Sequence, residues 1–182
     1  MGNKGESMTL TELLAIDGPC YFAHPYTVKD DHGRYIPAGE DANFMIASYW
    51  GGLLIQAGLV IYNPISHTHP MHSANPLFLS RHEHEMWYRL DETQIRHTNW
   101  VSLILGLGWR LSKGCLAERT IFTNLGKPIV MLSDLIPELL ERGILDAGFR
   151  RETNVPERCG QGSGRNQEPS RLILPVCPVA DR

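Results

Sequence analysis

Two carboxylates, Glu118 and Asp91, lie on predicted helices from which both could face one ligand. Glu118 is expected in the first turn of its helix, where the partial positive charge of the helix start favours the ionised, nucleophilic form. The unpaired amides there also favour an anion such as phosphate. The residues expected to bind that phosphate are Ser112, Lys113 and Gly114. With Glu118 attacking and Asp91 protonating the leaving group, the pair could cleave an N-glycoside.

Each carboxylate also has an ordinary interpretation that spacing alone favours. Glu118 could be a helix-start carboxylate that only complements the helix dipole. Asp91 could be a solvated residue on an exposed helix face. The two positions therefore predict chemistry only in combination with the rest of the chain.

Histidines form the second group of residues with chemical potential. His67, His69 and His72 lie in a predicted loop at 65–80, and His82 and His84 follow it. A metal site needs three or four converging ligands, and no fixed spacing of the HExxH type occurs here. We favour loop histidines that hydrogen-bond substrate or neighbouring backbone, with no metal and no cofactor.

Composition places the chain among soluble globular proteins. Its 182 residues suit one domain, with 42% hydrophobic and 20% charged residues. A net charge of −3 without a basic stripe argues against nucleic acid as a partner. The four widely spaced cysteines fit a reducing compartment, and the polar start at 1–9 and the short apolar runs lead us to expect neither a signal peptide nor a membrane span. We expect a cytoplasmic protein.

Short apolar runs alternate with stretches of helical spacing, which predicts an α/β fold. The order is typical of a flavodoxin-like or Rossmann-like three-layer sandwich with four or five parallel strands. Predicted strands cover 19–23, 59–62, 101–105 and 128–132, and predicted helices cover 41–57, 81–98, 115–125 and 134–140. We divide the chain into a lead at 1–18, a domain at 19–149 and a flexible tail at 150–182, whose apolar patch at 172–176 could add an edge strand.

Ligands of open parallel sheets bind beyond the carboxyl ends of the strands. Three segments follow such ends, at 24–26, 63–73 and 106–118. His24 begins the first of these segments and His67 lies within the second, so we include both among the substrate-binding or phosphate-binding residues.

The motifs at these strand ends resemble the nucleoside 2-deoxyribosyltransferase superfamily, especially its branch of small bacterial and phage proteins. The similarity covers roughly 19–132 and is carried by an ordered series of motifs. These motifs are YFAHPY at 21–26, NPISHTHP at 63–70, GWRLSKG at 108–114 with Glu118, and GKP at 126–128.

The resemblance implies a role for several residues. Glu118 matches the nucleophile that forms a covalent sugar intermediate, and Asp91 matches the acid that protonates the departing base. Tyr21 matches the tyrosine that orients the nucleophile. Ser112, six residues before Glu118, matches a serine that binds the 5′-phosphate in nucleotide N-hydrolases of the superfamily. Family members close their sites with a neighbouring chain, so a homodimer is expected.

We therefore expect cleavage of the N-glycosidic bond of a nucleoside 5′-monophosphate, with release of the base or transfer of the sugar. Two alternatives stay open. One is a nucleotide-binding module without turnover, against which the presence of both carboxylates argues. The other is a metal-dependent hydrolase that uses the histidines.

Overall fold

The computed structural model describes residues 8–27, 32, 37–74 and 83–146, which all belong to one compact unit. Its centre is a four-stranded parallel sheet in the order β2-β1-β3-β4. This confirms the expected Rossmann-like or flavodoxin-like α/β class. The expected edge strand at 172–176 and the tail lie outside the described residues. The strands are β1 (Pro19–Ala23), β2 (Val60–Tyr62), β3 (Ser102–Leu105) and β4 (Ile129–Met131).

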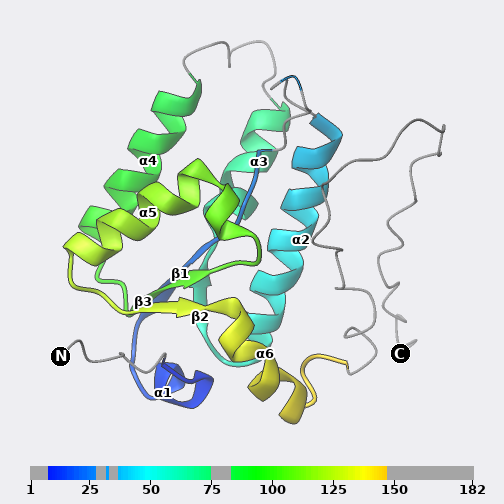
Figure 1. Ribbon diagram of the computed structural model, residues 1–182, viewed down its shortest axis with the longest axis vertical. Helices are drawn as coiled ribbons and strands as arrows, with labels where there is room; N and C mark the ends of the chain where they lie inside the picture. Colours follow the sequence, from blue (N-terminus) through cyan, green and yellow to red (C-terminus); the bar gives the residue numbers. More distant parts are fainter. Residues whose placement is uncertain (1–7, 28–31, 33–36, 75–82, 147–182) are drawn as a thin grey trace. The chain divides into compact units, whose positions relative to one another are not determined.

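Helices cover both faces of the sheet, with α4 and α5 on one side and α2 and α6 on the other (Figure 1). None of the described helices combines the length and apolar character needed to cross a bilayer. The helices are α1 (Leu10–Leu14), α2 (Pro37–Gln56), α3 (Pro64–Ala74), α4 (Glu83–His97), α5 (Lys113–Asn124) and α6 (Leu132–Glu141), with a 3₁₀ turn, η1, at Trp109–Leu111.

Strand alternation separates the interior into two cores. In β1, Cys20 and Phe22 point into the core shared with α1, α2 and α6. Tyr21 and Ala23 point into the core shared with α4 and α5. Successive side chains of a strand point to opposite faces of the sheet, so residues of one strand can act at the same site only if they are an even number of positions apart. Tyr21 lies on the α4/α5 face.

The predicted loop at 65–80 is wrong over its first part, because α3 occupies Pro64–Ala74. Asn63 begins this helix: its Oδ1 accepts hydrogen bonds from the amides of Ile65 (3.0 Å) and Ser66 (3.3 Å). Its Nδ2 donates to the Ala47 carbonyl of α2 at 3.0 Å. A capping Asn followed by a proline at the first helical position is a recognised helix start, which the histidines had obscured.

Three other helix starts also differ from expectation. Helix α2 begins at Pro37, four residues before the predicted start at 41. Helix α6 begins at Leu132, two residues before the predicted start at 134, so Asp134 lies in its first turn. Helix α5 begins at Lys113, because Ser112 is its N-cap. Glu118 therefore lies in the second turn rather than the first, where the charge of the helix start is weaker.

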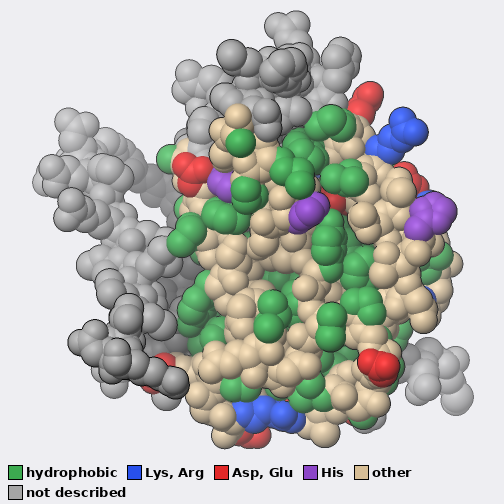
Figure 2. Space-filling model, turned by 180° about the vertical axis from the view of Figure 1, so that it is seen from behind, with side chains coloured by type: hydrophobic (Ala, Val, Ile, Leu, Met, Phe, Trp, Pro, Cys, Tyr) green, Lys and Arg blue, Asp and Glu red, His purple; other side chains and the backbone are tan. Residues whose placement is uncertain are grey.

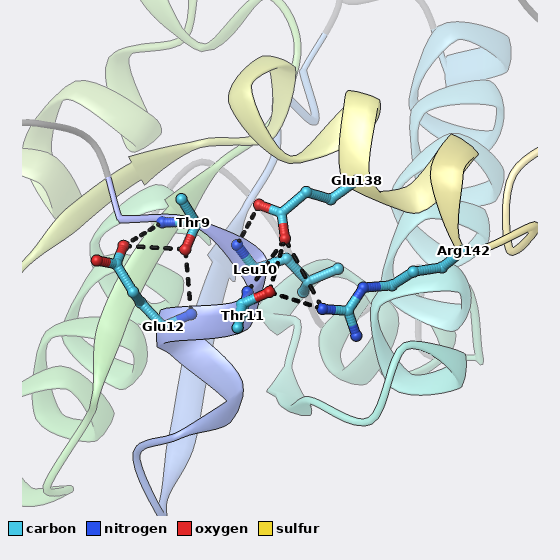
Figure 3. Close-up of polar contacts among 6 residues, drawn as sticks. All are labelled: Thr9, Leu10, Thr11, Glu12, Glu138 and Arg142. Atoms are coloured by element: carbon cyan, nitrogen blue, oxygen red, sulfur yellow. Dashed lines mark hydrogen bonds and ion pairs between the residues drawn. The ribbon is translucent and has the colours of Figure 1, made fainter.

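Helix α1 was not expected from the polar lead, and two sets of side-chain contacts hold its N-terminal end. Thr9 and Glu12 form a capping box. The Glu138 carboxylate accepts hydrogen bonds from the amides of Leu10 (2.8 Å) and Thr11 (3.2 Å), and Arg142 donates to Thr11 Oγ1 at 2.8 Å (Figure 3). Leu10 and Leu13 are thereby fixed in the core beneath α6. We call these contacts the α1–α6 clamp.

Candidate active site

The Tyr21 hydroxyl donates a hydrogen bond of 2.7 Å to Glu118 Oε1. Tyr21 is fully buried in β1, and Glu118 is 8% exposed in α5, which packs against the same face of the sheet. No described residue hydrogen-bonds to the second carboxylate oxygen, Oε2. The arrangement fixes one oxygen of Glu118 and leaves the other available to a ligand.

Burial sets the charge state of Glu118. Loss of solvation is the largest influence, and it raises the pKa of this carboxyl to about 7. The Tyr21 hydrogen bond opposes that shift because it stabilises the carboxylate, while the charge of Asp91 adds to it. The sequence led us to expect that the helix start favours ionisation of Glu118, but the residue lies in the second turn of α5, and the largest influence on its pKa is burial, which opposes ionisation.

Asp91 projects from α4 into the same electrostatic environment. Burial raises its pKa to about 7, and its Oδ1 is enclosed without a hydrogen-bond partner in the described part of the chain. The charge of Asp91 also raises the pKa values of Tyr21 and Tyr62, after burial. The fold thus brings Asp91, Glu118 and Tyr21 together, although they lie on three different elements.

The two carboxyls influence one another, so their protons leave in sequence. Only Glu118 has a hydroxyl that stabilises its anion, and Asp91 Oδ1 has no comparable partner. These contacts therefore favour the anion on Glu118 and the proton on Asp91, while burial raises the pKa of both carboxyls to about 7. This is the division of roles that a nucleophile and a general acid need.

The sequence did not predict that Tyr62 and Trp100 pack beside Tyr21, and we call these three rings the aromatic wall of the site. Tyr62 pairs in register with Tyr21, and their ring centroids are 5.7 Å apart. Trp100 contacts both rings, at 5.3 Å from Tyr21 and 5.7 Å from Tyr62. Tyr62 is the last residue of β2, so its place at a carboxyl strand end was the signal that could have identified it.

Ser112, Lys113 and Gly114 form the start of α5, upstream of Glu118 on the same helix. The Ser112 Oγ accepts a hydrogen bond from the Cys115 amide at 3.3 Å, and Lys113 and Gly114 are exposed. Glu118 is five residues after Lys113, which corresponds to a rise of about 7.5 Å along the helix. A small molecule could therefore contact both the helix start and the carboxylate.

His24 is separated from the carboxylates by strand parity. Its ring lies 6.0 Å from Phe22, on the α2/α6 face, and is 7% exposed. Its Nδ1 donates to the Pro25 carbonyl at 2.9 Å, so Nε2 is the unprotonated nitrogen, and burial lowers the pKa of the ring. A neutral ring with a bare acceptor repels phosphate oxygens. The expected phosphate-binding role of His24 therefore has no support in this geometry.

The ring fits closely against Gly106, which follows β3. A Cβ at that position would lie 2.5 Å from His24 Cδ2 and 3.1 Å from the Ala23 carbonyl oxygen. Any other residue would displace the ring or the strand end.

The described histidines of the 63–73 segment differ in environment, and Figure 2 shows histidine side chains among hydrophobic ones on one face of the molecule. His67 is exposed on α3, with its ring 6.0 Å from Tyr62. His69 is packed between elements: it stacks on Phe44 at 4.2 Å, and its Nδ1 is 2.8 Å from the Tyr26 hydroxyl. His67 thus borders the aromatic wall, whereas His69 joins α3 to α2.

Among the residues described, no three His, Cys, Asp or Glu side chains converge in a way that could hold a metal ion. His82 and the side chain of His84 lie outside this part of the chain.

A cavity of ≈ 240 Å³ opens at the carboxyl ends of β3 and β4, beneath η1. Its lining consists of residues 105–111 with Met131 and Ser133. Tyr21, Asp91 and Glu118 do not line this cavity, so it does not contain the two carboxylates.

Comparison with known proteins adds the family but no activity. No match to a curated protein was found. Residues 18–134, which include the four described strands and Tyr21, Asp91 and Glu118, match a domain of unknown function, DUF1937. The chain belongs to the DUF1937 family.

Proposed function

We propose that this protein cleaves the N-glycosidic bond of a nucleoside 5′-monophosphate through a covalent sugar–Glu118 intermediate. One observation carries the proposal: a buried glutamate is held by a tyrosine hydroxyl at 2.7 Å, beside a second buried carboxyl. Buried carboxyls with perturbed pKa values cluster at sites of chemistry. The similarity of the strand-end motifs to the nucleoside 2-deoxyribosyltransferase superfamily supports the same assignment.

In the first step, Glu118 Oε2 attacks the anomeric carbon as the bond to the base breaks. Tyr21 holds Oε1 and so orients the carboxylate. Asp91 transfers its proton to the departing base, whose nitrogen takes the electron pair of the broken bond. The products are a neutral base, an ester between the sugar and Glu118, and an ionised Asp91.

In the second step, an acceptor attacks the ester and releases Glu118. Asp91, now a base, takes a proton from the acceptor. A water acceptor completes hydrolysis, and a second base completes transfer. The buried environment suits both steps, because a carboxyl with a pKa of about 7 can donate and accept a proton at neutral pH.

The start of α5 favours a substrate that carries a phosphate. Glu118 and Ser112 share one helix, so a sugar at Glu118 would direct its 5′ substituent along the helix toward the exposed amides. Lys113 adds a positive charge there. This explains our preference for nucleotides over free nucleosides.

The test is release of base from a panel of ribonucleoside and deoxyribonucleoside 5′-monophosphates, followed by chromatography. A 2-fluoro-substituted substrate slows the second step, so the sugar should remain attached and be located on Glu118 by mass spectrometry. Glu138→Gln is the matched control, since Glu138 is a hydrogen-bonded glutamate outside the site. Absence of base release across the panel, or a label on another residue, would refute the proposal.

A further inference from the structure

Four buried side-chain atoms have no hydrogen-bond partner in the described part of the chain, and two of them lie beside Glu118. These two are Tyr62 Oη and Asp91 Oδ1. The other two belong to His24 and Ser102, whose strand positions have the parity of the α2/α6 face. An unsatisfied buried polar atom weakens a fold, so two on one wall of one site indicate a place where a ligand binds.

The ring contacts of Tyr62 fix where its hydroxyl lies. The register of β1 and β2 sets Tyr62 next to Tyr21, and contacts with Tyr21 and Trp100 at 5.7 Å each hold the ring. The charges of Asp91 and Glu118 both act on the Tyr62 hydroxyl. The Tyr62 hydroxyl is therefore within electrostatic range of both carboxyls, and in the described part of the chain it forms no hydrogen bond with either.

The two atoms have complementary chemistry. Burial and the neighbouring charges raise the pKa of Tyr62, so its hydroxyl stays protonated and can donate. Asp91 is ionised once it has protonated the base, and it then accepts. A molecule that accepts a hydrogen bond from Tyr62 and donates one to Asp91 would satisfy both atoms at once. Water is the smallest molecule that can do both.

We propose that Tyr62 and Asp91 hold the water that hydrolyses the sugar–Glu118 ester, which makes this chain a hydrolase rather than a transferase; this rests on the proposed function. The water oxygen bonds to the anomeric carbon as the bond from that carbon to Glu118 breaks. The electron pair of the broken bond returns to Glu118. One water proton passes to Asp91, and the products are the free sugar phosphate and the starting enzyme.

Tyr62→Phe tests the proposal because it removes only the hydroxyl. Rapid-quench measurements with the best nucleotide of the panel should show an unchanged first turnover of base release. The steady-state rate should then fall up to about tenfold, as expected for the loss of one hydrogen bond between uncharged groups. Mass spectrometry should find the sugar–Glu118 adduct accumulating. In the presence of a second free base, more of the sugar should pass to that base than in the wild type.

Tyr88→Phe is the matched control, because Tyr88 is 46% exposed on α4 and belongs to no part of the site. It should behave as wild type in all three measurements. The thermal midpoint of Tyr62→Phe should not fall, since the lost hydroxyl has no partner.

Failure of this inference is distinguishable from failure of the proposed function. If the wild type releases no base, the proposed function is wrong and the inference falls with it. If the wild type releases base but Tyr62→Phe retains its steady-state rate and its product ratio, only the role of Tyr62 is overturned. An equal slowing of the first turnover would also overturn it, because the hydroxyl would then act on the departing base.

Discussion

Two glutamates of this protein, Glu118 and Glu138, each accept a hydrogen bond from a hydroxyl group, yet their environments have opposite effects on their charge. Glu118 is buried against the sheet, and burial raises its pKa to about 7. Glu138 lies near the surface of α6. Its partial burial tends to raise its pKa, but hydrogen bonds from Leu10 and Thr11 and the charge of Arg142 together lower it.

The difference shows what each carboxylate contributes. Glu138 is stabilised as an anion by the amides it caps, so ionisation strengthens the fold. Glu118 is less stable as an anion in the folded chain than in the unfolded one, so ionisation weakens the fold. A side chain kept in an environment that weakens the fold is a candidate for function, whereas one that strengthens it needs no further explanation.

The largest expected effect is the loss of activity on changing Glu118. In Glu118→Gln the nucleophile is gone, so base release should fall by about 10⁴-fold or more. Glu138→Gln should retain the wild-type rate, because its helix face is remote from the Tyr21 hydrogen bond. Steady-state assays on both purified variants measure this contrast. Similar losses in the two variants would remove the distinction between the glutamates.

The second effect is on stability as a function of pH. Glu118 and Asp91 have pKa values of about 7 in the fold, above their ordinary values of 4.5 and 3.8. The folded state therefore holds more protons, and the free energy of unfolding should decrease as pH rises from about 4 to about 7. Each carboxyl contributes on the order of a few kcal/mol to that decrease.

Urea unfolding at about pH 5 and about pH 8 tests this expectation. The decrease in the wild type should become smaller in Glu118→Gln and smaller still when Asp91→Asn is added. A decrease of unchanged size in the double variant would show that other groups cause it.

The third effect compares two of the side-chain N-caps, Ser112 of α5 and Thr9 of α1. Ser112→Ala should weaken binding of a nucleoside monophosphate about tenfold and leave the corresponding nucleoside little changed. The same change removes a cap and costs about 1 kcal/mol of stability. Ser112→Asp separates these roles, because it keeps the cap but repels a phosphate.

Calorimetric titration with each ligand measures the effect. Thr9→Ala should reduce stability alone. If Ser112→Asp bound the monophosphate as well as wild type, no phosphate would contact this helix start.

The smallest effect is expected at the α1–α6 clamp. Glu138→Ala removes the acceptor for two backbone amides and should lower the free energy of unfolding by about 1–2 kcal/mol. Glu141→Ala, an exposed change on the same helix, should have almost no effect. Urea unfolding at neutral pH compares the two, and a loss in Glu141→Ala of the same size would mean that the helix itself, and not the clamp, had been weakened.

Much of the fold followed from local pattern. The first strand has the predicted bounds, Pro19–Ala23, because an apolar run closed by a His-Pro pair leaves little alternative. Helix α3 was missed because the histidines and the length of the connection suggested a loop, although Asn63 and Pro64 form a helix start signal. The sequence pattern predicts an element correctly when its residues all favour the same structure. It fails when the start signal and the composition of a segment favour different structures.

The site was less accessible from pattern alone. Tyr21 and Glu118 are 97 residues apart, so only the resemblance connected them, and neither spacing nor composition could show their hydrogen bond. The burial of Glu118 was also hidden, because a carboxylate on a helix is ordinarily exposed. The alternation of side chains along a strand explains why Tyr21 and His24 lie on opposite faces of the sheet, because they are three residues apart.

The α1–α6 clamp has a consequence for how the chain folds as it is synthesised. Leu10 and Glu138, which the clamp joins, are 128 residues apart, and both lie outside the matched family segment 18–134. Leu10 and Leu13 remain without their cover until α6 has left the ribosome, so the first core can close only when nearly the whole domain has been made. A fragment cut at the limits of the family match would keep the four described strands and both carboxylates of the site. It would lack Leu10, Leu13, Leu135 and Leu139 of that core, and we expect it to aggregate rather than fold.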